Sequence, residues 1–554
     1  MFEDLRGRVD PDTTTTLRNA APYNLLPSSH KGTVGLRNGS YEPTGPKLPT
    51  ALGSRVPSNK ASNVLVASGQ RSATGRPLFV GGPQINYFFP GLVSEISLHG
   101  PSIDARGVTA PPFPGYMLIG RTADFAWTLT SAEGDIVDSF AETLCGRSRT
   151  KYEFDGKCRA MEKVEAGTIV KGDDRTKVTF YRTVHGSVIG YAKTRGGKTV
   201  AIARKRSSYG RDTVDQLVFQ DLTFGRIKSF AGFAKAASQT PQTFNAFYAD
   251  ATTAGMYTTG ALPTRPNGAD GDLPTDGRGT FEWTGYLAAS KHPQGTVPNG
   301  VLVNWNNKPA PKFAASDTRF GDETMFTRDD MLVAELQRTL VHTLGSVVGA
   351  MNAAATEDVR GRIFWPVLKA VLDKGGSPSA LATSAVAQID AWAQNRAPRL
   401  DVDGDGNLDD AGVAIMDGGW KRIADAAMCP TLGTKLCNQL ATQQPRFESP
   451  NDRDNQYSGW YHYMAKDLST LLGLPVKQEY SRGYCGGGNL KRCSAALWRA
   501  IDQTASELAA EQGPDPAAWR ESAAPQTIHF RPLDLIPIAY TNRPSGIQQV
   551  ISFG

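Results

Sequence analysis

The chain has 554 residues, of which 40% are hydrophobic and 21% are charged, so it can bury one large core or two to three ordinary ones. Its 60 basic and 54 acidic side chains give a formal charge of +6 and are scattered along the whole length. This composition is typical of a globular protein with a mildly basic surface, and it lacks the clustered basic stripe that nucleic-acid binding needs.

The first part of the chain, residues 1 to about 60, is rich in Thr, Pro, Gly, Ser and Asn. Such a composition buries little apolar surface, so it predicts a linker. The opening stretch MFEDLRGRVDPDTTTTLRN has no apolar segment of the kind found in signal peptides, and no run of 18 apolar residues occurs in the sequence.

Short β-branched and aromatic runs separated by Gly, Pro and Asp dominate residues 62–325 and predict a β-rich core. Examples are NVLVAS, KVTFYRTV, KTVAIAR and GVLVNW. The segment TVDQLVFQDLTFGRIKSFAGFAKAASQ, in contrast, repeats apolar residues every three to four positions, so it should include at least one helix.

Helical periodicity takes over in residues 326–525, as in MLVAELQRTLVHTLGSVVGAMNAA and SALATSAVAQIDAWAQ. The last residues, 526–554, return to a strand pattern. A β-rich part and a helical part that share a returning strand favour an α+β fold built in layers over two independent domains.

Six cysteines fall into three pairs of near neighbours, and none has the CxxC spacing of a zinc or redox site. Local pairs predict three disulfides, which persist in an oxidising compartment, so we expect an extracytoplasmic location, periplasmic or secreted, although this chain shows no signal peptide. Six cysteines allow 15 pairings, and unrelated buried thiols are the alternative. The pairs expected from proximity are Cys145 with Cys158, Cys429 with Cys437, and Cys485 with Cys493.

Common catalytic motifs are absent from the sequence, which has no GxSxG elbow, no HExxH, no phosphate-binding loop and no GxGxxG after a strand. The seven histidines lack metal-ligand spacing, so we expect them to be structural or on the surface. A serine nucleophile in this chain would therefore need a base other than histidine.

Ser62 stands where the polar leader meets the apolar run NVLVAS. If the peptide bond before this serine is cut, the new α-amine has a pKa of about 8 and lies close to the serine's own hydroxyl. That amine can act as the base. Position alone is weak evidence, because most serines at such a junction cap or turn the chain.

Several segments of the chain match, in one order, the motifs of a single enzyme family. They are SNVLVASG from Ser62, VGGPQ at 80–84, FPG at 113–115, FAWTLTSAEGDIVDSF at 125–140, YRTVHG at 181–186, FYAD at 247–250, VNWNNKPAP at 303–311, ASD at 315–317 and the tail TNRPSGIQQVISF. In these segments the chain resembles the penicillin acylases, the penicillin amidase family of N-terminal nucleophile hydrolases. SNVLVASG resembles the opening of that family's β-chain, and VGGPQ resembles its Asn-Gly-Pro-Gln turn with Gly81 in place of the asparagine.

The resemblance implies an αββα sandwich with a helical C-terminal portion. Residues 1–61 would be the end of an α-chain plus a spacer, and residues 62–554 would be the β-chain. Ser62 would be the nucleophile, exposed when the precursor cleaves itself between Ala61 and Ser62. The rest of the α-chain, which this sequence does not contain, would be the partner after processing, and we expect impaired folding or activity without it.

Four other residues match positions that act in catalysis in the family. The side-chain amide of Asn306 and the backbone N–H of Ser131 would bind the oxyanion, although NWNN also suits a simple turn. Gln84 would lie beside the nucleophile and steady the α-amine and the substrate. Arg328 would lower the pKa of the amine by like-charge repulsion, or it forms a surface ion pair.

Two groups of acidic residues suggest structural calcium. By resemblance, Asp135, Val137, Asp138 and Asp317 hold one ion together with a Glu of the absent α-chain. The loop DVDGDGNLDDAG has an EF-hand spacing, with Asp401, Asp403 and Asp405 at positions 1, 3 and 5, but Gly412 stands where a Glu belongs. Asp409 or Asp410 could complete this second site, and a solvated acidic turn is the alternative. No organic cofactor is expected.

The resemblance implies an amidohydrolase that acts on small N-acyl amides, and we expect no nucleic-acid partner and no membrane span. Positions that match the family's acyl pocket carry Ile85, Ile119 and Leu129, and each of these could equally be a core residue. The expected substrates are penicillin-like compounds or N-acyl-homoserine lactones. Alternatives are an acylase for other N-acylated peptides or lipids, and a calcium-stabilised secreted binding protein that has lost turnover.

Overall fold

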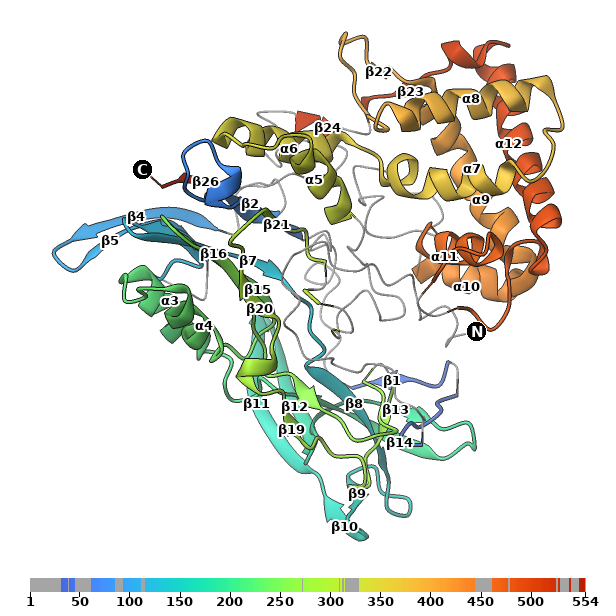
Figure 1. The fold of residues 1–554 in the computed structure, drawn as a ribbon. Coiled ribbons are helices and arrows are strands. Elements are labelled where there is room, and N and C mark those ends of the chain that lie inside the picture. The colour runs from blue at the N-terminus through green and yellow to red at the C-terminus, as the bar shows by residue number, and fades with distance from the viewer. Residues whose placement is uncertain are drawn as a thin grey trace.

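The molecule is built in four layers, with two stacked sheets between two layers of helices (Figure 1). Helices α5 (Arg328–Gln337) and α6 (Leu344–Thr356) cover one sheet, and α3 (Asp215–Thr223) and α4 (Phe230–Ala237) cover the other. The sequence patterns predicted an α+β fold in layers, and this arrangement is the αββα sandwich that the family resemblance implied. The computed structural model describes residues 31–37, 39–44, 61–84, 93–110, 115–271, 273–307, 309–310, 313, 328–443, 461–476, 479–524, 527–528, 538–539 and 548–553.

The first sheet contains the strand that begins just before Ser62. Its side chains alternate, so that Val64 and Val66 face the second sheet while Leu65 and Ala67 face the helices, and all four are fully buried. Burial of both faces explains the continuous apolar run of this strand. The four antiparallel strands, in spatial order, are β21 (Val301–Asn304), β2 (Ala61–Ala67), β3 (Leu78–Gln84) and β26 (Gln549–Ser552).

The C-terminal strand β26 therefore returns to the first sheet, as the sequence predicted. The segment VGGPQ lies within β3 and is not a turn. A Cβ at Gly81 would lie 3.0 Å from Cγ2 of Thr128 in the second sheet, so a glycine allows the two sheets to approach closely here.

The second sheet packs its other face on α3 and α4 through an aromatic core that includes Phe125, Trp127, Phe233 and Tyr248. All its strand pairs are antiparallel. In spatial order the strands are β20 (Gln294–Thr296), β16 (Ala254–Thr258), β15 (Phe244–Asp250), β7 (Phe125–Ser131), β6 (Ile119–Thr122), β5 (Ile103–Thr109) and β4 (Ser94–Gly100).

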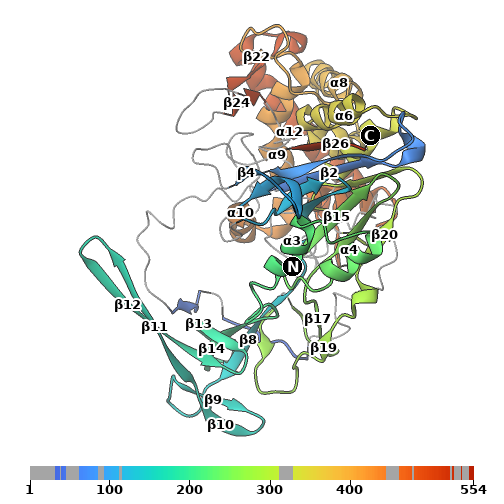
Figure 2. The same cartoon turned by 90° about the vertical axis from the view of Figure 1, so that its left-hand side faces the viewer.

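A third sheet extends from the sandwich, and its long hairpin β11–β12 projects away from the body (Figure 2). Part of the leader pairs with this sheet through β1 (Glu42–Pro43), so this part is not the free linker that its composition predicted. The other strands are β11 (Glu162–Lys171), β12 (Asp174–Thr183), β13 (Gly186–Lys193), β14 (Thr199–Arg206), β8 (Val137–Thr143) and β18 (Thr275–Asp276), with the hairpin of β9 (Lys151–Phe154) and β10 (Lys157–Ala160) beside them.

The helical region continues the core of α5 and α6, and its buried apolar residues form one cluster with Leu65, Ala67, Leu78 and Val80 of the first sheet. The apolar run at 331–354 forms two helices, because Thr343 caps a new helix by accepting a hydrogen bond from the N–H of Ser346. The remaining helices are α7 (Trp365–Leu372), α8 (Ala380–Gln394), α9 (Ala411–Leu432), α10 (Thr434–Gln443), α11 (Tyr461–Leu471) and α12 (Leu490–Gln512).

The structure joins the cysteines in the three pairs expected from their proximity in the sequence. Among the residues that the structure describes, none of the helices is both long and apolar enough to cross a bilayer. The disulfides are Cys145–Cys158, Cys429–Cys437 and Cys485–Cys493.

Candidate active site

Ser62 lies at the start of β2, half-buried, opposite Pro83 of the neighbouring strand β3. Its backbone N–H donates a hydrogen bond of 2.7 Å to Oδ1 of Asn306. These two residues are 244 positions apart in the chain. The fold therefore places the predicted nucleophile and the predicted oxyanion donor in direct contact.

Asn306 is held in a rigid turn that follows β21. Its φ of 64° lies in the left-handed region, which Asn tolerates better than most residues. Oδ1 of Asn304 accepts hydrogen bonds from the N–H of Asn306 (3.0 Å) and from Oγ1 of Thr130 (2.6 Å). Oδ1 of Asn307 accepts from the N–H of Trp305 at 2.9 Å. Because these groups are buried, their hydrogen bonds fix the position of the Asn306 side chain.

Ser131 ends strand β7 on the other sheet, and its carbonyl accepts a hydrogen bond of 3.1 Å from Nδ2 of Asn306. The next residue, Ala132, donates its N–H to the carbonyl of Thr243, beside β15. Since successive residues of a strand direct their N–H and C=O groups to opposite edges, Ser131 directs both of its groups away from β15. The N–H of Ser131 thus lies on the edge of β7 that faces Asn306.

For the other predicted catalytic and pocket residues, the structure describes only some positions and side chains. Gln84 ends β3 opposite Ala61, and Arg328 begins α5, which packs on β21. Ile119 and Leu129 are buried in β6 and β7. Leu129 belongs to the buried cluster that includes residues of α3 and α4. Ile85 and Asp317 lie outside the described residues, as do the side chains of Gln84 and Arg328.

The carboxylates of Asp135 and Asp138 converge as the predicted calcium site requires, but an arginine lies between them. The guanidinium of Arg265 contacts both oxygens of Asp138, at 2.8 and 2.7 Å, and Oδ2 of Asp135 at 2.8 Å. The indole Nε1 of Trp283 donates to Oδ2 of Asp138 at 2.6 Å. Val137 begins β8 next to them. The described residues therefore fit a calcium ion here only if Arg265 moves away from Asp138.

The loop from Asp401 to Asn407 brings the carboxylates of Asp401, Asp403 and Asp405 within 4.8 Å of one another. Oδ1 of Asp401 accepts hydrogen bonds from the N–H groups of Gly404 (2.8 Å) and Asp405 (3.1 Å), which curl the loop around this residue. Gly404 and Gly406 adopt the positive φ values of 74° and 90° that the tight turn requires. Three hard oxygen ligands in such a loop fit Ca²⁺.

Asp410, which the sequence offered as a further ligand of this loop, is the N-cap residue of α9. Burial, followed by the charge of Asp409, raises the pKa of Asp410. A cation bound in the loop would oppose this shift, because a nearby positive charge favours the ionised carboxylate.

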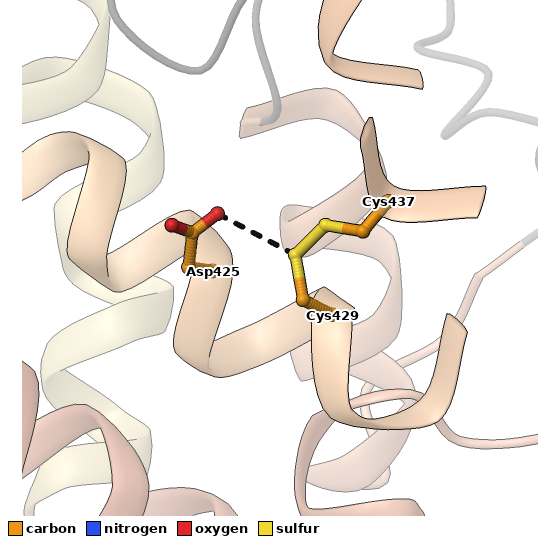
Figure 3. Close-up of side chains that lie close together, drawn as sticks. All are labelled: Asp425, Cys429 and Cys437. Carbon is orange, nitrogen blue, oxygen red and sulfur yellow. Dashed lines mark hydrogen bonds between the residues drawn. A yellow bond between two sulfur atoms is a disulfide. The ribbon is translucent and has the colours of Figure 1, made fainter. Parts of the chain in front are cut away.

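Asp425, Cys429 and Cys437 form another close group of potential metal ligands (Figure 3). The two sulfurs are joined in a disulfide that links α9 to α10, and Oδ1 of Asp425 lies 3.4 Å from Sγ of Cys429. Disulfide sulfur is not the thiolate that binds metals. This group is therefore no metal site in the oxidised protein.

Sequence reasoning missed the residues that support the site. The sequence suggested a turn at NWNN, but it did not indicate that Asn304 and Thr130 hold this turn in place, or that Arg265 contacts the acidic group at Asp138. The contact of Asn63 with Gln548 was also missed. No local signal in the sequence reveals that contact, because the two residues are 485 positions apart.

Comparison with known protein families gives a match over nearly the whole chain. A family model described as penicillin amidase matches residues 3–548. Penicillin G acylase of Escherichia coli is 29% identical over 404 residues, which cover 72% of this chain and 44% of that protein. The acyl-homoserine lactone acylase QuiP of Pseudomonas syringae pv. syringae (strain B728a) is 28% identical over 255 residues, which cover 46% of this chain and 30% of that protein.

A solved structure of thermostable penicillin G acylase from Alcaligenes faecalis superimposes with a TM-score of 0.70 and 24% identity, covering 83% of this chain and 80% of that one. This similarity supports the fold. The chain spans less than half of the length of the two curated relatives named above.

Proposed function

Because this chain belongs to the penicillin amidase family, we propose that it is an amidohydrolase whose nucleophile is Ser62, made amino-terminal by cleavage of the bond after Ala61. The contact of 2.7 Å between the backbone nitrogen of Ser62 and Oδ1 of Asn306 carries this proposal. After cleavage, the same nitrogen becomes the α-amine, and Asn306 accepts a hydrogen bond from it.

The α-amine is the general base in this mechanism. Its pKa of about 8 lets it take the proton of the Ser62 hydroxyl near neutral pH, directly or through a water. The serine oxygen attacks the carbonyl carbon of the amide, and the protonated amine then gives its proton to the leaving nitrogen. An acyl-enzyme remains, which water hydrolyses under the same base to release the carboxylic acid.

The oxyanion of the tetrahedral intermediate forms next to Ser62, within reach of two donors. One is Nδ2 of Asn306, whose Oδ1 contacts the Ser62 nitrogen, and the other is the N–H of Ser131 on the facing edge of β7. Each donor of this kind contributes about 3 to 4 kcal/mol in enzymes where it has been removed. The rigid NWNN turn supports this role, because a preorganised donor needs no reorganisation during the reaction.

The substrate is an N-acyl amide with an apolar acyl group. Relatives named as penicillin acylases and acyl-homoserine lactone acylases make penicillin-like compounds and N-acyl-homoserine lactones the first candidates. By the same resemblance, the proposed partner is an α-chain, and the family model matches this chain over residues 3–548. Three disulfides favour an oxidising, extracytoplasmic compartment.

Calcium is a structural ion in this proposal, and the loop at Asp401–Asn407 is its preferred site. Its three carboxylates accept hydrogen bonds from backbone N–H groups, and within the part of the chain that the structure describes they form no ion pair with a basic side chain. Asp135 and Asp138 both form ion pairs with Arg265, so calcium binds there only with displacement of that side chain.

The test is to express the chain with its upstream segment and to compare the wild type with Ser62→Ala. The wild type should split into two chains and hydrolyse penicillin G or an N-acyl-homoserine lactone, whereas Ser62→Ala should do neither. Ser377→Ala, which changes an exposed serine far along the chain, is the matched control and should behave as the wild type. Hydrolysis that persists in Ser62→Ala would refute the mechanism.

A further inference from the structure

The last segment of the chain reaches the strand that carries the nucleophile. Strand β26 pairs with β3, with Gln549 opposite Gly81, and β3 in turn pairs with β2. Asn63 of β2 lies opposite Gly82. The residues at the start of β26 are therefore level with the end of β2 where Ser62 lies.

Gln548, just before β26, makes a side-chain contact with the residue next to the nucleophile. Its Nε2 donates a hydrogen bond of 2.7 Å to Oδ1 of Asn63. The Asn63 side chain has no solvent exposure and shares the face of β2 that carries Leu65, toward the helices. Loss of a hydrogen bond to a buried amide oxygen is costly, so this contact helps to hold the Asn63 side chain in place.

Gln549, the next residue, contacts the strand that carries the second oxyanion donor. Its Nε2 donates a hydrogen bond of 3.2 Å to the carbonyl of Trp127 in β7, the strand that ends at Ser131. Successive residues of a strand point to opposite faces. One glutamine thus faces the helix layer and binds β2, while the other faces the second sheet and binds β7.

We propose that Gln548 and Gln549 are positioning residues. They hold strand β2, which carries Ser62, and strand β7, which ends at Ser131, at the separation that catalysis requires. This inference rests on the proposed function of Ser62, Asn306 and Ser131. The reacting groups come from two different sheets, so their spacing depends on how the sheets are fixed to each other. A displacement of about 1 Å between reacting groups can lower the rate about 100-fold.

The experiment measures kcat and KM of the processed enzyme obtained from the full precursor, as wild type and as the variants Gln548→Leu and Gln549→Leu. These variants approximately keep the size of the side chain but remove the donor. Rates are normalised to the fraction of chains that are split before Ser62, determined by intact mass. Each variant should lower kcat about 10- to 100-fold and change KM less than threefold. Gln548→Glu, which keeps the shape and lacks the donor, should resemble Gln548→Leu.

Val550→Ala is the matched control, because Val550 lies in the same strand and its side chain is exposed. This control should retain the kcat of the wild type. The melting temperatures of all variants show whether a lower rate results only from a smaller fraction of folded protein. If both leucine variants keep kcat within threefold of the wild type, or lose rate only in proportion to unfolded protein, the inference is wrong. Wild-type protein that lacks hydrolysis dependent on Ser62 would instead refute the proposed function.

Discussion

At the scale of single residues, the proposed mechanism gives Asn306 two chemically distinct tasks. Its side-chain oxygen accepts a hydrogen bond from the nitrogen of Ser62, and its side-chain nitrogen, which donates to the carbonyl of Ser131, would also donate to the oxyanion. The sequence motif identified this asparagine, because NWNN stands in a series of matching segments. The acceptor role could not be read from the motif, since it depends on the meeting of residues 244 positions apart.

Replacement of Asn306 by Asp should separate the two tasks. Aspartate keeps an acceptor for the amine but offers no N–H to the oxyanion, so kcat should fall about 100- to 1000-fold while KM changes little. Asn395→Ala, at the exposed end of α8, is the control. Steady-state kinetics on a chromogenic amide measure the effect, and a loss below tenfold would remove Asn306 from the oxyanion site.

His185 is a buried residue outside the proposed mechanism, and both its ring nitrogens face carboxylates. Nδ1 lies 2.8 Å from Oε1 of Glu142, and Nε2 lies 2.5 Å from Oε1 of Glu282. Burial opposes the charged imidazolium, but the hydrogen bonds and charges of the two glutamates outweigh it, so the pKa of His185 is raised. The sequence predicted that each histidine is structural or on the surface, and the structure buries His185 between two glutamates.

Replacement of His185 by Gln should therefore cost most stability at low pH. A raised pKa contributes stability that is fully present below the unfolded value of about 6.5 and is lost as pH rises through the folded value. We expect a loss of about 3 kcal/mol at pH 6 and a smaller loss at pH 9, measured by denaturant unfolding. His99→Gln, whose ion pair with Asp104 is exposed, should cost less than about 1 kcal/mol. An equal loss for His185→Gln at both pH values would contradict this account.

At the scale of elements, a disulfide between Cys485 and Cys493 connects two parts of the helical region. Cys485 and Cys493 join the turn before α12 to its first residues and close a loop of small size. Removal of this disulfide by a double change to Ala should lower the free energy of unfolding by about 2.5 kcal/mol, mainly through the entropy of the unfolded chain. Chemical denaturation measures this change in the free energy of unfolding. An unchanged denaturation midpoint would show that the Cys485–Cys493 disulfide does not constrain the unfolded state.

The acidic loop before α9 should bind calcium. Millimolar Ca²⁺ should raise the melting temperature of the wild type, and a chelator should reverse the change. Asp401→Asn with Asp403→Asn should abolish this response, because two of the three converging carboxylates lose their charge. Asp425→Asn, beside the Cys429 disulfide, is the control and should retain it. A response that survives in the double variant would place the ion elsewhere, with Asp135 and Asp138 as the first alternative.

At the scale of the whole molecule, the helices and strands were predictable from the sequence, and the contacts between residues far apart in the chain were not. Period-two and helical patterns gave the strands and helices, and the returning strand β26 was expected from the tail. Arg265 contacts Asp138, although the two residues are 127 positions apart in the sequence. The residues around each of them contain no pattern that predicts this contact. The leader composition predicted a linker, yet β1 pairs with β13, because backbone pairing at a sheet edge needs few apolar side chains.

The central claim is that the catalytic hydroxyl belongs to an amino-terminal residue. The most direct measurement is to label active enzyme with a reagent that sulfonylates the nucleophilic serine hydroxyl, and then to determine the first residue of the labelled chain by mass spectrometry. The account predicts that the label lies on Ser62 and that Ser62 is the first residue of that chain. A fully active preparation in which Ala61 and Ser62 remain joined, or a label on another residue, would contradict it.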